Sequence, residues 1–193
     1  MANTNAAMGG RPVGSLIGAP ISGMVNTYTA KADYATALYI GDPVVVTGER
    51  DNGHQVVALA TAGATNQITG FIVGFEPTPG IVSLGYGAAS TLRFPIVCDD
   101  PAALFELQED AVGGAIAVAS IGLNINLVSG SGNAYTKKSG WMIDSNTAAG
   151  DATYQMTIRD IVTRIDNEEA TAYAKYLCTI NLHTRRLGAV AGL

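Results

Sequence analysis

Charged residues are scarce in this sequence. Only 14% of its 193 residues are Asp, Glu, Lys or Arg, whereas about a quarter is usual in soluble domains. Hydrophobic residues make up 48%. A surface so poor in charge indicates that part of it is covered by other molecules, most simply by further copies or by a larger assembly.

Cysteine is scarce too. Its two residues, Cys98 and Cys178, lie far apart, and no Cys-x-x-Cys pair occurs. This spacing excludes a zinc ribbon and a thioredoxin-type redox motif. Each cysteine lies in an apolar, strand-like stretch, which is typical of a small buried side chain. The sequence leaves open whether the two form a disulfide.

Clusters of positive charge are nearly absent. The net charge is −5, and adjacent basic residues occur only at Lys137–Lys138 and Arg185–Arg186. Phosphate binding needs clustered Lys and Arg, so neither nucleic acid nor an anionic membrane is expected as a partner. The longest uncharged apolar region, residues 111–128, is interrupted by Gly, Ser and Asn. We interpret it as core rather than as a membrane span.

No catalytic arrangement stands out. Only His54 and His183 are available as bases, and Gly-x-Ser-x-Gly does not occur, so a Ser/His/Asp site is not expected. Residues 85–90 lack the last glycine of a dinucleotide-binding motif, and no Asp-x-Asp-x-Asp-Gly calcium loop is present. We therefore expect no enzyme activity, no metal and no cofactor. A small hydrolase that uses Glu106 or Glu109 is an alternative from another class.

Strand signals dominate what is present. Asn52–Gly53 separates two apolar runs and predicts a hairpin. Residues 173–183 alternate between two faces with a period of two, which indicates a strand. Short strands with turn signals between them, and no long amphipathic helices, predict an all-β fold. We expect an antiparallel β-sandwich or a β-barrel, jelly-roll-like, with at most one or two short helices.

The first 24 residues differ from the rest of the chain. Residues 12–30 carry no charge, and Leu16, Ile17 and Ile21 are scattered among Gly, Ser and Pro. Such a segment cannot form its own core, yet it is too apolar for a solvated tail. Two interpretations remain: a disordered terminus, or an extended N-terminal arm (1–24) that orders on a neighbouring subunit. Residues 25–193 would then form a single β-rich domain.

Acidic residues gather in one stretch, 98–110. They are Asp99, Asp100, Glu106, Glu109 and Asp110. Asp100–Pro101 predicts a turn, and the run after it favours a strand. It is interpreted either as a half-buried strand with a solvated polar face, or as a docking strand whose acids face a basic partner. Trp141, the one Trp, is expected to anchor the core or a subunit interface.

DDPAALFELQED in this stretch, with ALYIGDPVVVTG upstream and NLHTRRLG near the end, resembles the cement, or head decoration, proteins of tailed bacteriophages. The resemblance runs over most of the chain, and GDPV and FELQED are its most distinctive parts. It implies a structural virion protein, made in the host cytoplasm, that binds the outer face of the capsid and bridges major capsid protein subunits. It also implies a homo-oligomer, for which we expect a trimer at a three-fold position.

The candidate interface residues are the three apolar residues of the arm, the five acids and Trp141. The alternative function is a carbohydrate- or cell-surface-binding β-sandwich module of a phage particle. Such a module would need a row of exposed aromatic side chains. Aromatic residues make up only 7% of the chain and show no such row in the sequence.

Overall fold

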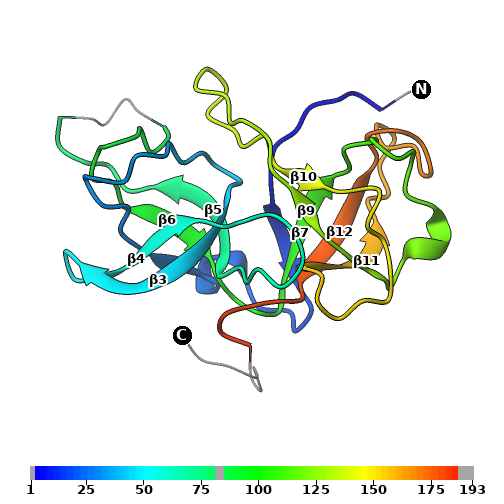
Figure 1. The fold of residues 1–193 in the computed structure, drawn as a ribbon, viewed down its shortest axis with the longest axis horizontal. Coiled ribbons are helices and arrows are strands. Elements are labelled where there is room, and N and C mark those ends of the chain that lie inside the picture. Colours follow the sequence, from blue (N-terminus) through cyan, green and yellow to red (C-terminus); the bar gives the residue numbers. More distant parts are fainter. Residues whose placement is uncertain (1–2, 81–84, 187–193) are drawn as a thin grey trace.

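β-Strands form nearly all of the regular structure (Figure 1). The structure is a computed structural model that describes residues 3–80 and 85–186. The helices of this part of the chain are two single 3-10 turns, η1 (Ile21–Gly23) and η2 (Val118–Ser120). No helix there is long and apolar enough to cross a membrane. The predicted all-β fold is confirmed.

Sheet A has five antiparallel strands in the order β1-β7-β12-β11-β8. They are β1 (Arg11–Ser15), β7 (Ala103–Gln108), β12 (Lys175–Ile180), β11 (Met156–Ile161) and β8 (Asn124–Ile125). A two-stranded piece, β9 (Leu127–Val128) with β10 (Met142–Ile143), contacts this sheet through β7.

Sheet B also has five antiparallel strands, in the order β2-β6-β5-β3-β4. They are β2 (Val25–Thr27), β6 (Pro95–Cys98), β5 (Gly70–Phe75), β3 (Pro43–Asp51) and β4 (His54–Leu59). Asn52 and Gly53 join β3 to β4, with φ of 49° and 83°. Positive φ at both positions is what a tight hairpin turn requires, so the hairpin is confirmed.

Because proline has no backbone N–H, it is tolerated within a sheet at an edge strand, at the first residue of a strand or at a bulge. β6 lies between β2 and β5. Pro95 is the first residue of β6, a position that proline tolerates, and it pairs with Phe75 next to an irregularity in β5.

The two sheets share one core. In sheet B, Phe71 and Cys98 face sheet A, while Ile72 and Val97 face a smaller core on the other side. The Phe71 ring lies 4.7 Å from the ring of Phe105 of β7, measured between centroids. Neighbouring residues of a strand point to opposite faces, so sheet B is buried on both.

The strand expected over residues 173–183 is confirmed for Lys175–Ile180, which form β12. Ala174, Tyr176 and Cys178 on one face are fully buried. Cys98 and Cys178 are both free thiols in the shared core, so the disulfide that the sequence left open is not formed. Burial raises the pKa of Cys98 to about 11 and that of Cys178 to about 12.

The N-terminal segment belongs to this fold. β1 pairs with β7, with Ser15 opposite Ala103, and the side chain of Gln108 binds the backbone of Thr4 and Ala6. In Figure 1 the segment, in blue, runs through the seam between the sheets. The expectation of an arm outside the domain must therefore be corrected for residues 3–15. β7 would otherwise be the edge of sheet A, and the chain covers that edge itself.

Two glycines allow this close packing. A Cβ on Gly9 would lie 2.0 Å from the carbonyl oxygen of Gly41, and one on Gly10 would lie 2.4 Å from the ring of Phe71. The N–H of Gly10 donates to the same carbonyl at 2.9 Å. A larger residue at either position would prevent the segment from packing this closely against the shared core.

Gly10→Ala is expected to lower the free energy of unfolding by about 1–3 kcal/mol, because the added methyl overlaps the Phe71 ring and the core must shift. Gly14→Ala is the matched control, since nothing lies within 4 Å of the position that its Cβ would take. Urea denaturation of both variants checks this. Equal midpoints would show that the segment does not pack on Phe71 in solution.

Candidate functional site

Glu106, in the middle of β7, is buried and binds two arginines of its own chain. Arg11 of β1 donates to its carboxylate at 2.5 Å. Arg164, from the loop after β11, donates to both oxygens at 2.8 and 3.1 Å. Only 2% of the Glu106 side chain is exposed. A buried carboxylate needs such partners, so Glu106 is unavailable to another molecule.

Asp99 is satisfied in the same way. Tyr28 donates to it from its hydroxyl at 2.5 Å, Asn26 from its amide at 2.8 Å, and Arg185 forms an ion pair with it. Burial, followed by the hydrogen bond to Asp99, raises the pKa of Tyr28. Both groups are fixed in position by the pairing.

The other three acids of the stretch accept hydrogen bonds from turns and loops of the chain. Asp100 accepts from the backbone N–H two residues further on, which fits the predicted turn. Asp110 accepts from the backbone and hydroxyl of Ser145 at 3.0 and 2.9 Å. Glu109 is fully buried and accepts from the N–H of Ile116 at 2.7 Å. Burial is the main cause that raises the pKa of Glu109.

The expectation of a docking strand with outward acids is therefore wrong, and so is that of a solvated polar face. Of the five acids, Asp100 is half-buried and the other four are buried. The physical reason is that each buried carboxylate found a cation or donor within the chain. The arginines that do this, Arg11, Arg164 and Arg185, are distant in sequence, and sequence reasoning missed their roles.

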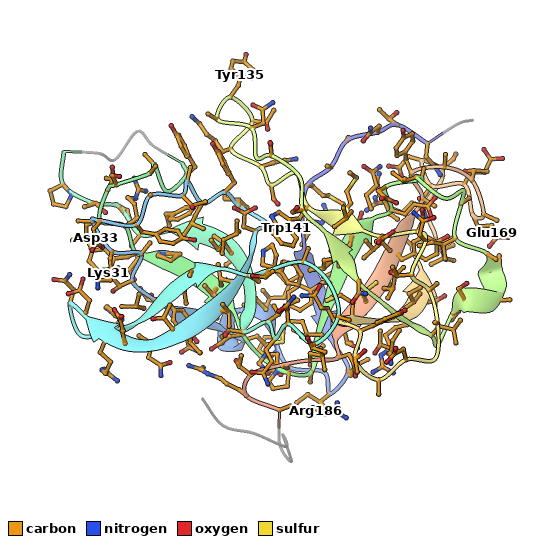
Figure 2. The ribbon with its side chains drawn as sticks, viewed as in Figure 1. Lys31, Asp33, Tyr135, Trp141, Glu169 and Arg186 are labelled. Atoms are coloured by element: carbon orange, nitrogen blue, oxygen red, sulfur yellow. The ribbon has the colours of Figure 1, made fainter. Side chains whose placement is uncertain are left out.

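Trp141 anchors the core. It is 3% exposed and belongs to the core shared by the two sheets. Figure 2 shows it in the middle of the molecule, between the sheets. Of the two roles expected for this residue, that of a core anchor is confirmed, and a burial this complete leaves no side-chain surface for a partner.

The three apolar residues expected in the arm do lie on the surface. Leu16 is 55%, Ile17 74% and Ile21 41% exposed, and Val13, three residues before Leu16, is 38% exposed. We call Val13, Leu16, Ile17 and Ile21 the apolar ridge. Exposed side chains of this size, close together in an uncharged segment, are typical of a surface that another molecule covers.

The backbone under the apolar ridge is ordered by the domain itself. Leu16 donates its N–H to the carbonyl of Ala102 at 2.9 Å, and Ile17 donates to the hydroxyl of Ser15 at 3.2 Å. Gly18 then turns the chain with a φ of 75°. The ridge is thus presented by a turn at the end of an edge strand, with its hydrophobic side chains outward.

The aromatic side chains give little support to the carbohydrate-binding alternative. Tyr39 and Tyr86 stack on each other with ring centroids 5.2 Å apart, and Lys137 lies over the Tyr86 ring. Tyr135 is 93% exposed at the tip of its loop, pointing away from the body of the molecule (Figure 2). A sugar stacks on a free ring face, and the paired rings are engaged by other residues of the chain.

The two histidines have different environments. His54 of β4 packs against the ring of Phe94, the residue before β6, with the ring planes at 63°. His183 is buried after β12, and this burial lowers its pKa to about 4. Within residues 3–80 and 85–186, no group of three or more His, Cys, Asp and Glu side chains is placed to hold a metal ion.

Comparisons with known proteins identify no relative. No protein-family model, no curated protein and no solved structure matches the chain.

Asp42, in the GDPV sequence, is a buried acid that sequence reasoning did not single out. Its carboxylate accepts from the backbone N–H of Tyr39 at 2.7 Å, and 3% of the residue is exposed. Burial raises its pKa to about 6, although hydrogen bonds from Ser139 and Tyr39 oppose the shift. The folded protein therefore binds a proton here more readily than the unfolded chain.

This shift predicts a pH dependence. A raised folded-state pKa means that stability is lost as pH rises from about 4 to about 6, and that the loss is complete above this window. Asp42→Asn removes the titration. Relative to native protein, the free energy of unfolding of this variant should rise by up to about 3 kcal/mol between pH 4 and pH 7. Urea denaturation across this range measures it, and parallel profiles for the two proteins would contradict it.

Glu106→Gln is expected to lower the free energy of unfolding by about 1–3 kcal/mol, because two charge-assisted contacts are lost at a buried position. The matched control is Glu49→Gln. Its ion pair with Lys31 is exposed on both sides and should contribute less than about 1 kcal/mol. Thermal or urea denaturation of the two variants distinguishes them. Equal losses would mean that the Glu106 pairing does not stabilise sheet A.

Proposed function

We propose that this protein is a structural virion protein, a cement or decoration subunit on the outer face of a phage head, where it bridges major capsid protein subunits. The observation that carries the proposal is the apolar ridge, an ordered and exposed hydrophobic surface in an uncharged segment. The resemblance of FELQED, GDPV and NLHTRRLG to such proteins supports it. So does the low charge content of the chain.

In the proposed mechanism, many weak contacts between subunits and capsid act together. Full burial of a Leu or Ile side chain is worth about 1.5–3 kcal/mol, and part of that gain is offset by the cost of association. One copy then binds a capsid weakly. Several copies linked in an oligomer, which we propose to be a trimer at a three-fold position, bind together far more tightly and resist expansion of the shell.

The partner contact cannot be led by the acidic stretch. Asp99, Glu106, Glu109 and Asp110 are buried, and they are neutralised or hydrogen-bonded within the chain. Of the expected interface residues, Leu16, Ile17 and Ile21 are the exposed ones.

The test is co-sedimentation with empty heads built from the major capsid protein of the source phage. Deleting residues 1–24 would remove β1 from sheet A, so a point substitution is the sharper probe. Ile17→Asp places a charge on the ridge and is expected to weaken head binding by at least about tenfold. Circular dichroism should show an unchanged fold, because Ile17 is 74% exposed.

Ile165→Asp is the matched control. Ile165 is fully exposed on the loop before β12, at the end of sheet A where Lys175 pairs with Gln108, whereas the ridge follows Ser15 at the other end. This variant should bind heads like the native protein. If the native protein does not bind heads, the proposed function fails. If Ile17→Asp binds normally, the ridge is not the contact.

A further inference from the structure

A small polar hollow lies between β2, the β3–β4 hairpin and the segment after β12. Its volume is about 220 Å³. The side chains that line it include Asn26, Tyr28, Arg50, His54, Gln55 and Arg185. A space of this size suits one side chain of a partner rather than a large ligand.

The charged side chains that line the hollow are both basic. Arg50 and Arg185 line it, and the described residues of the lining include no Asp or Glu. Two carboxylates next to it are engaged within the chain: Asp99 by Tyr28, Asn26 and Arg185, and Glu76 by the hydroxyl of Thr27 at 2.7 Å. An anion that enters would therefore meet two guanidinium groups.

The two arginines are held in place before any ligand arrives. Arg185 pairs with Asp99, donates to the amide oxygen of Gln55 at 2.6 Å and lies 5.5 Å from the centre of the Tyr28 ring. Arg50 donates to the carbonyl of Gly53 at 2.8 Å. A guanidinium carries several N–H donors in a planar fork, so both groups keep donors for a ligand.

We propose that this hollow binds a carboxylate side chain, Asp or Glu, of the protein partner that covers the apolar ridge. A carboxylate matches the fork of an arginine with two parallel hydrogen bonds. Ile21 of the ridge is five residues from Asn26 of the hollow, so the two are at most about 18 Å apart. One partner segment with hydrophobic and acidic residues can reach both. The role of the partner rests on the proposed function; the carboxylate site does not.

Arg50→Gln tests the site on the isolated protein. The probe is N-acetylglutamate with its α-carboxyl blocked as the methylamide, titrated into isotope-labelled protein while backbone amide shifts are followed. Native protein should show saturable shifts at Asn26, Gly53 and Gln55, and Arg50→Gln should weaken binding by at least about tenfold. Arg50 is exposed, so this variant should fold, whereas Arg185→Gln would leave Asp99 buried without its cation.

Arg159→Gln is the matched control. It removes the same charge from an exposed residue of β11 in sheet A, so binding of the probe should be unchanged. Equal weakening by both variants would mean that the probe responds to net charge alone and would overturn the proposal. Inorganic phosphate serves as a second probe. If phosphate binds tightly and the glutamate probe does not, the site is not one for a carboxylate.

Measurement of binding to empty heads tests the carboxylate site and the proposed function separately. If the isolated protein binds the probe but native protein does not bind heads, the carboxylate site stands and the proposed function fails. If native protein binds heads and Arg50→Gln binds them equally well, the hollow is not part of the contact. Support requires weaker binding of Arg50→Gln to both the probe and the heads.

Discussion

The buried carboxylate of Glu106 constrains much of this structure. It lies in β7 between β1 and β12, with 2% of its side chain exposed, where an uncompensated charge would cost several kcal/mol. One arginine reaches it from β1 and the other from the loop after β11. The N-terminal segment therefore cannot leave sheet A without exposing the edge of β7 and breaking one of these two pairs.

This constraint fixes the position of the apolar ridge. Because β1 is paired with β7 up to Ser15, the residues that follow must turn at the end of the sheet. Their hydrophobic side chains then lie outside the core, which is already filled by Phe71, Phe105 and Trp141. A hydrophobic surface on an ordered backbone has little conformational entropy to lose when a partner covers it. A free arm with the same residues would have lost much more.

The fold could be predicted from the sequence in its local parts. The Asn52–Gly53 hairpin and the alternation around Tyr176 follow from backbone geometry and from one buried face, which short-range pattern reveals. The pairing of β1 with β7 could not be predicted, because it joins strands far apart in sequence and depends on Gly9 and Gly10 lying against Gly41 and Phe71. Nothing in the pattern of residues 1–24 indicates these contacts.

The candidate site, like the fold, could be predicted only where it depends on residues that are close in sequence. Leu16, Ile17 and Ile21 could be selected from sequence because hydrophobic side chains in an uncharged, Gly-rich segment have no local core to enter. The acids could not be assigned correctly, because an acidic cluster looks alike whether it is solvated or paired with distant arginines. Asp99 is buried and pairs with Arg185, whose side chain is partly exposed. An acid that the sequence counts as one more negative charge thus orders an arginine at the surface, and net charge alone does not reveal this.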